Sequence, residues 1–458
     1  MAGSIVSGAG LAAVEPVNNL GSIGASDLQI RTGNAVQAVC VQFNKNGADG
    51  DLQADLFDKC GEMVHTANSL NGIDGPVAKD LGISREQLQA ALQNVAGEET
   101  VATGSLATEA SGSQTANVSK RLSALLSRNG SFRLSAVNLF GSYALYRPDT
   151  AEARGGAGGD EDTLMASRWG VFVHGDIGTG EKDASAAEDG FSYDTRGMTL
   201  GADYRFGNGM VAGLAAGLSS TSSDFDETDT VSGGDMDADV ASFSLYALAY
   251  AGPVFFDGIV TLGQGRFDLT RSIVIASESD QAENDGADRE ARSDTDSTQT
   301  AVSLGVGSEY NFGAVSLAPY LRAQYLDVEV DGFTETGAQG LNLRVSDQSI
   351  ESVTSSLGVR LSRVSNTGFG VLVPQARLEW VHEYSDDVRE VETVYANDPR
   401  ENVLLTVTDE PDRDYFSLGL GASAVLRNGI QMFADVRTLM GLRDFSETQM
   451  TLGARFEL

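Results

Sequence analysis

Few residues of this chain have the type and spacing needed for catalysis or metal binding. The three histidines, His65, His174 and His382, fall on different predicted elements and lack the spacing of metal ligands. Segment 44–51 partly matches a calcium loop, but Asp49 stands where an EF-hand requires glycine. We therefore predict no catalytic residue, no metal and no cofactor, and expect His174 and His382 to be ordinary strand residues.

The two cysteines, Cys40 and Cys60, are the other reactive side chains. Apolar residues at helical spacing flank both, so Cys60 could be a buried core thiol. If the protein is exported, however, an oxidising compartment favours a Cys40–Cys60 disulfide. Closing a loop of this size would stabilise the fold by roughly 3 kcal/mol.

The N-terminal part divides into two regions by composition. Residues 1–30 are small, glycine-rich and aperiodic, which predicts a flexible segment. Residues 31–110 show helical spacing, including a helix start at Ser84 with Gln87 three positions later, which is a capping-box pattern. We predict a small helical region there, stapled by the disulfide.

The charge balance limits the kinds of partner. Lys and Arg number 31 against 65 Asp and Glu, a net charge of −34, which argues against a nucleic-acid partner. No run approaches the ~18 apolar residues of a membrane helix, although strand alternation conceals a barrel from that test.

Residues 111–134 contain no acid although the protein is strongly acidic. Within them, 115–128 has the spacing of a helix with one apolar side and several basic residues. The basic residues are Lys120, Arg121, Arg128 and Arg133. Two interpretations remain open: an amphipathic helix on a core, or a helix inside a charged pore. Residues 135–166 read as a linker.

From residue 167 onward the pattern changes to strands. Between 198 and 206, apolar residues such as Leu200 alternate with polar ones such as Asp203, which is the strand period. We predict twelve strands, at about 168–178, 192–206, 209–222, 237–251, 254–275, 299–312, 314–329, 342–362, 368–385, 404–427, 429–439 and 445–458.

The connections between these strands alternate in length. Short turns alternate with loops that are mostly long and acidic, and loop 276–298 holds eight acids against two arginines. An even number of strands, with short turns at one end of the sheet and long loops at the other, is typical of an outer-membrane barrel. A soluble sandwich would also not carry so many inward charges, which are Asp203, Arg205, Arg322, Arg377, Glu379, Asp435, Arg437 and Arg455. We predict that 167–458 is an all-β, twelve-stranded antiparallel transmembrane barrel.

The last strand carries a terminal motif. In 451–458 the apolar and polar residues alternate, with Glu457 on the polar side. The spacing of Thr451, Gly453 and Phe456 resembles the signal recognised by the bacterial barrel-assembly machinery, although the chain ends in Leu458 where most such proteins end in an aromatic residue.

A basic helix before a terminal twelve-stranded barrel resembles the translocator domain of bacterial autotransporters (type V secretion). The similar stretches are 117–126, which includes Asn117 and Leu122, then 168–206, and the last strand. The resemblance implies an outer-membrane location, a helix in the pore, and an N-terminal region carried to the cell surface. Asn117 is not followed by a second asparagine, so the resemblance implies no self-cleavage there, and the Gly-Asp-Ser motif of the family's esterase passengers is absent.

The resemblance and the charge pattern lead to further expectations. We expect the pore helix to place Lys120, Arg121 or Arg128 against inward acids, namely Asp203, Glu379, Asp435 or Glu457. Expected partners are outer-membrane lipid, lipopolysaccharide (through divalent cations at the acidic loops) and the barrel-assembly machinery, for a monomer. The alternative function is a porin-like channel or a surface adhesin acting through its acidic loops.

Overall fold

A computed structural model of the 458-residue chain describes residues 14–139, 168–185, 188–206, 209–227, 232–385, 388–426 and 430–457. For residues 109–111, 127–139, 232 and 457 it describes the backbone alone.

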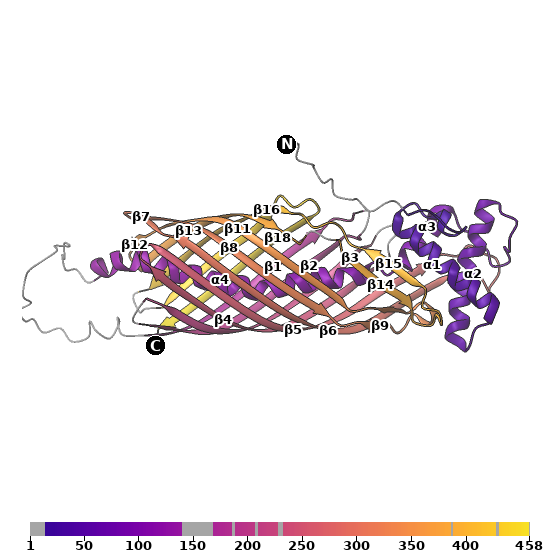
Figure 1. The fold of residues 1–458 in the computed structure, drawn as a ribbon, viewed down its shortest axis with the longest axis horizontal. Coiled ribbons are helices and arrows are strands. Elements are labelled where there is room, and N and C mark those ends of the chain that lie inside the picture. The colour runs from indigo at the N-terminus through magenta and orange to yellow at the C-terminus, as the bar shows by residue number, and fades with distance from the viewer. Residues whose placement is uncertain are drawn as a thin grey trace, which may run out of the picture.

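Twelve antiparallel strands form a closed barrel (Figure 1). Each strand pairs with the next along the chain, and β18 pairs with β1 to close the ring. The barrel strands are β1 (Trp169–Lys182), β2 (Phe191–Arg205), β3 (Val211–Glu227), β4 (Ser232–Ala251), β5 (Val254–Ile275), β6 (Ala287–Ser308), β8 (Val315–Val330), β11 (Gln348–Arg363), β13 (Gly370–Glu383), β16 (Asp414–Leu426), β17 (Gln431–Met440) and β18 (Phe445–Glu457). The predicted twelve-stranded barrel is confirmed.

The two faces of each strand follow the period-two pattern. In β18, Leu452 and Phe456 point outward and are 52% and 42% exposed, whereas Thr451 and Arg455 point inward and are buried. Closure pairs β18 with β1 and so removes the free edges of the ring, while residues 287–296 of β6 continue beyond the end of β8.

Several strands are longer than predicted, and the loops between them are correspondingly shorter. The predicted loop 276–298 is mostly strand, because β6 begins at Ala287 and pairs with β5 as far as Ile275. The two strands have 22 residues each, about twice the 9–11 that cross a bilayer. Acids on the outward face of such a strand point into water, so their charge does not interrupt pairing. The prediction of a long acidic loop there was wrong.

A second, four-stranded sheet lies at the loop end of the barrel. It contains β9 (Phe333–Thr334), β10 (Leu343–Val345), β14 (Glu390–Tyr395) and β15 (Val403–Val407), with η2 (Gln339–Leu341) beside it. It divides the predicted strands 342–362 and 404–427, since β10 and β15 leave the barrel wall. Two short strands, β7 (Tyr310–Phe312) and β12 (Ser365–Thr367), extend turns at the opposite end.

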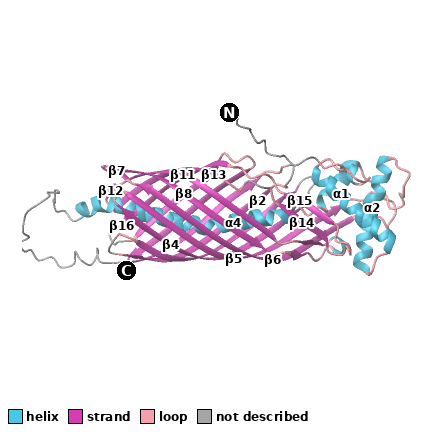
Figure 2. Ribbon diagram, in the orientation of Figure 1, coloured by secondary structure: helices cyan, strands magenta, loops and turns pink. Residues whose placement is uncertain are grey.

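The helical bundle, which we define as residues 14–98, stands on the loop end (Figure 2). It contains η1 (Gly21–Ile23), α1 (Asp27–Asn46), α2 (Asp51–Asn71) and α3 (Arg85–Asn94). Ser84 and Gln87 form the predicted capping box of α3. Cys40 and Cys60 form the predicted disulfide between α1 and α2, with Cα atoms 5.7 Å apart.

The described part of the predicted flexible segment 1–30 is ordered. Leu20 and Ile23 are buried in the core of the helical bundle, and Ser26 caps α1 with its own capping box. Small residues there allow close packing rather than disorder, so the prediction was wrong for 14–30. Residues 1–13 lie outside the described part.

The helix α4 (Glu99–Leu139) runs through the barrel from the helical bundle to the turn end (Figure 1). Its 41 residues span about 60 Å at 1.5 Å per residue. It is therefore longer than the predicted helix 115–128 and includes 135–139 of the predicted linker. The remainder of that linker, 140–166, lies outside the described residues. None of the described helices is both long and apolar enough to span a membrane.

Candidate functional site

The candidate site is the barrel lumen around α4. One side of the helix packs on the wall through Val118, Leu122 and Leu125, whose side chains are buried. They share a core with aromatic residues of the wall, including Phe172 and Tyr246. The helical spacing of these residues is the local cause of this apolar side.

A buried ion pair joins α4 to the wall near this apolar side. Arg121 Nε donates to Asp203 Oδ2 on β2 at 2.9 Å, and a second guanidinium nitrogen donates to the same oxygen. Both side chains are at most 3% exposed. Arg455 on β18 approaches Asp203 to 3.4 Å, and the guanidinium of Arg121 lies 5.1 Å from the ring centre of Phe172. This is one of the helix–wall pairs expected from the sequence.

Lys120 contacts neutral oxygens instead of the expected acids. Its Nζ donates to Gln449 Oε1 at 2.8 Å and to Thr451 Oγ1 at 2.5 Å, both on the closing strand β18. Asn117 donates to Asp176 Oδ1 on β1 at 2.7 Å. Asn117, Lys120 and Arg121 of α4 thus bind β1, β18 and β2, which are the two strands of the closing seam and the strand next to β1.

Most of the other predicted lumen charges pair within the wall. Arg322 bonds Asp257 at 2.8 Å, Arg437 bonds Glu447 at 2.7 Å, and Arg377 lies 3.8 Å from Asp435. Tyr320 donates to Glu379 at 2.6 Å. The expectation that Glu379 or Asp435 would meet a basic residue of the helix is therefore corrected, because Arg377 of β13 lies 4.0 Å from Glu379 on the same strand and 3.8 Å from Asp435 on β17.

The remaining predicted positions are Arg205, Arg128, Glu457 and Leu458. Arg205 is half-buried near the turn end of β2. The side chains of Arg128 and Glu457, and the whole of Leu458, lie outside the described part. Sequence analysis did not select Asp176, Asp257 or Glu447, although their inward position in the period-two alternation would have indicated them.

A polar junction fastens the helical bundle to the barrel where α4 enters. Arg271 on β5 is 1% exposed and donates to both carboxylate oxygens of Glu335, at 2.9 and 2.7 Å. It also donates to the carbonyl oxygen of Asn94 at the end of α3. Arg289 on β6 binds Asp55 of α2 in the same two-pronged manner, at 2.6 and 2.7 Å. The Arg271–Asn94 hydrogen bond and the Arg289–Asp55 pair join the bundle to the long β5–β6 hairpin, and Glu335 neutralises Arg271.

Acids collect at the first turn of α4, outside the membrane span. Burial, reinforced by the nearby Asp189 and Glu99, raises the pKa of Glu98 to about 10. Burial likewise raises the pKa of Glu99 to about 8, although Arg271 acts in the opposite direction. Near neutral pH these carboxyl groups hold protons, and Gln93 donates to Glu98.

The predicted assembly motif lies on the closing strand. Thr451 faces the lumen, Phe456 faces outward, and the ring of Phe433 packs directly against the Cα of Gly453, where a side chain would collide with it. Their role in assembly remains a prediction.

The histidines occupy separate environments. His174 is buried between the rings of Phe172 and Phe433, His65 accepts a hydrogen bond from the Lys79 backbone, and His382 lies 2.9 Å from Asp414. Among the residues that the structure describes, no three His, Cys, Asp or Glu side chains could together hold a metal ion.

A closed barrel with an apolar outer surface and a polar lumen that encloses a helix defines the class of outer-membrane barrel proteins. Residues 171–437, more than half of the chain, match the family model described as the autotransporter β-domain. The chain belongs to this family, and the family inferred from sequence is confirmed.

Two curated proteins and a solved translocator domain are similar to parts of this chain. The chain is 28% identical over 244 residues to the esterase EstA of Pseudomonas aeruginosa, covering 50% of this chain and 34% of EstA. It is 29% identical over 237 residues to a Pseudomonas putida protein named for the trpE–trpG intergenic region, covering 48% and 36%. The translocator domain of NalP from Neisseria meningitidis is 16% identical with a TM-score of 0.49, covering 65% of this chain and 91% of that one. The chain thus spans about a third of the length of the curated relatives it matches.

Proposed function

We propose that this chain is an autotransporter translocator that carries its own N-terminal region to the cell surface and remains anchored there. The path of α4 supports this proposal most directly. The helix enters the lumen from the end that carries the helical bundle and leaves it at the end with the short turns (Figure 1). In outer-membrane barrels short turns face the periplasm and longer loops face outward, which would place the bundle outside the cell.

After transport, α4 closes the lumen. Its apolar side packs on the wall, and Arg121 and Asn117 bind acids of β2 and β1. A charge left without its partner in this environment would be costly, so the helix has a defined resting position. The helical bundle then docks on the long hairpin through Arg271 and Arg289 and covers the outer end.

The proposal includes the partners expected from the sequence. Outward apolar residues such as Leu452 would contact lipid, and acids above them, such as Asp296, would meet lipopolysaccharide through divalent cations. The barrel-assembly machinery would recognise the motif at Thr451, Gly453 and Phe456. Pairing of β18 with β1 removes the two sheet edges that another copy could extend, which favours a monomer. We assign no catalytic activity to the chain.

An epitope inserted in the exposed α1–α2 connection at 47–50 tests the orientation. Antibody should bind this variant on intact cells, and binding should not increase when the outer membrane is permeabilised. A matched control carries the same epitope in the short turn 252–253, which should be reached only after permeabilisation. The reverse pattern would overturn the proposal. A porin-like channel would in addition conduct as purified, whereas a closed translocator should conduct little until α4 is removed.

A further inference from the structure

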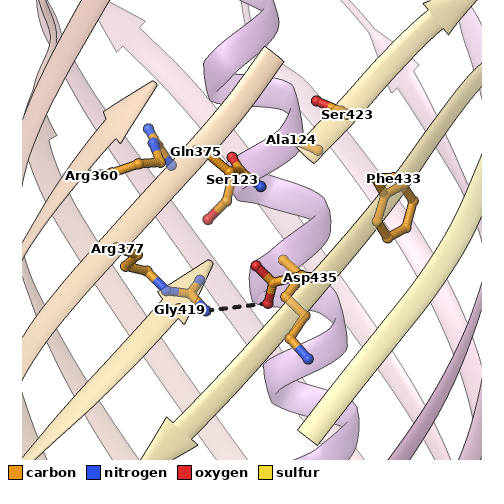
Figure 3. A pocket seen from close by; sticks show the side chains of 10 residues that line it. Ser123, Ala124, Arg360, Gln375, Arg377, Gly419, Ser423, Phe433 and Asp435 are labelled. Carbon is orange, nitrogen blue, oxygen red and sulfur yellow. Dashed lines mark ion pairs between the residues drawn. The ribbon is translucent and has the colours of Figure 1, made fainter. Parts of the chain in front are cut away.

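The lumen is not completely filled by α4. On the side away from the apolar contact, a small cavity of about 20 Å³ lies between the helix and strands β11, β13, β16 and β17. Figure 3 shows Arg360, Gln375 and Arg377 of the wall around the helix segment that carries Ser123 and Ala124. A larger polar cavity of about 230 Å³ shares Lys120 and Arg377 with it.

Positive charge predominates around the small cavity. Its lining includes Lys120, Arg360 and Arg377 but a single acid, Asp435. Asp435 is 3.8 Å from Arg377, which is an ion-pair distance but not a hydrogen bond. Lys120 is bound to two neutral oxygens, so its charge is not compensated by direct contact.

Arg360 on β11 is a buried cation at the wall of this cavity. Its side chain lines the cavity and is only 6% exposed. Within the described ranges, no hydrogen bond or ion pair joins its guanidinium to a protein group, and the Nε of Arg377 is likewise buried without a hydrogen-bond partner. Glu309 is the acid that acts on Arg360 through its charge, but the two side chains form no ion pair among the described contacts. A buried guanidinium without a partner is costly, and buried charges are ordinarily paired.

We propose that this cavity binds one small monovalent anion of halide size, held between Lys120 of α4 and Arg360 and Arg377 of the wall. A water molecule needs about 10–15 Å³ of such volume, so the cavity admits a single-atom ion and excludes tetrahedral sulfate or phosphate. The anion connects α4 to β11 and β13, on the side of the lumen opposite the Arg121–Asp203 pair. Chloride thereby stabilises the closed barrel.

Thermal unfolding of the folded full chain in detergent tests the site. At equal ionic strength, the unfolding temperature should be higher in sodium chloride or bromide than in sodium gluconate, and the gain should saturate with halide concentration. Arg360→Gln should abolish this halide dependence, whereas Arg360→Lys should retain part of it. Arg363→Gln is the matched control, because Arg363 is exposed on the same strand and should leave the dependence unchanged.

General salt effects on stability are separated by comparing variants in the same salts. Sulfate should raise the unfolding temperature of the wild type and Arg360→Gln equally, because it acts by exclusion from the surface. Equal halide effects in the wild type and Arg360→Gln would overturn the proposal.

Bromide provides a direct probe. Crystals of the full chain grown in bromide should show an anomalous peak between Lys120 and Arg360, and the peak should disappear in Arg360→Gln. A cavity that contains water alone under these conditions would refute the site even if the unfolding temperatures differ.

Discussion

Replacing Arg121 with alanine tests how α4 is held in the lumen. The substitution removes the cation that binds Asp203 at 2.9 Å, in surroundings where both side chains are at most 3% exposed. Breaking a buried pair by removing one partner costs about 3–5 kcal/mol. Because Arg455 remains 3.4 Å from Asp203, we expect the lower value, about 3 kcal/mol.

The apolar contacts of α4 should keep the helix in the lumen even after the Arg121–Asp203 pair is lost. Val118, Leu122, Leu125 and Leu126 are at most 4% exposed, and burying each contributes about 1.5–3 kcal/mol. Their sum, about 6–12 kcal/mol, exceeds the loss of the ion pair, so the helix should remain in the lumen most of the time. A change of about 3 kcal/mol should raise the open fraction by about two powers of ten.

Single-channel recording in planar bilayers measures this fraction. Arg121→Ala should open briefly and about 100-fold more often than the wild type, to the same level as a variant lacking 111–134. With all variants recorded in sodium gluconate, where no halide occupies the small cavity, Lys120→Ala is the matched control. Its loss leaves only the neutral groups of Gln449 and Thr451 without a donor, and Gln449 lines the adjoining larger cavity. Its cost should be about 1 kcal/mol, less than a tenfold change.

Two results would refute this reasoning. Equal open fractions for Arg121→Ala and Lys120→Ala would mean that the buried ion pair does not hold the helix. Additive effects of Arg121→Ala and Asp203→Asn, without a coupling energy, would mean that the two side chains do not act as a pair.

Three further predictions concern the bundle junction and assembly. Arg271→Met leaves Glu335 buried without its cation and should destabilise the junction by about 3–5 kcal/mol, seen as faster proteolysis of the helical bundle; unchanged proteolysis would count against the junction. The pKa values of Glu98 and Glu99 are raised above their ordinary 4.5 to about 10 and about 8, so the folded state holds protons that the unfolded state releases above pH 4.5. Stability should therefore be complete below about pH 4.5 and fall as pH rises through 8 toward 10, and a joint change of both residues to Gln should flatten this dependence in thermal unfolding; a slope that persists would contradict the assignment. Phe456→Asp should lower surface levels strongly, because the charge replaces an outward apolar residue of the closing strand, and normal surface levels in immunoblots of outer-membrane fractions would contradict the assembly role.

Local sequence patterns determined the barrel, the direction of its side chains and the presence of a helix before it. The alternation around Asp203 fixes which residues face the lumen, because successive side chains of a strand point to opposite faces of the sheet. The spacing of Val118 and Leu122 similarly fixes one side of α4. The Cys40–Cys60 disulfide followed from there being two cysteines near two predicted helices.

Strand ends could not be determined in the same way. The acid-rich segment 287–296 is compatible with a loop or with a strand that continues beyond the membrane, since acids face water in either case. Pairing with β5 decides for the strand, and this pairing places Ala287 and Ala291 under the helical bundle. The upper part of the β5–β6 hairpin and the helical bundle share one hydrophobic core. The sequence of either segment by itself does not indicate this contact.

The partners inside the lumen were decided only by tertiary structure. Alternation places Asp203 and Asp435 inside the barrel, and the resemblance places Lys120 and Arg121 there on a helix, but neither indicates the rotation of α4 or the stagger of the strands. The rotation of α4 and the stagger of the strands determine that Asp203 pairs with Arg121 and that Asp435 lies beside Arg377. They also determine that Lys120 binds neutral oxygens. The same stagger leaves Arg360 buried at a cavity without a protein partner, because a closed ring fixes every inward position at once and cannot adjust one side chain's surroundings independently.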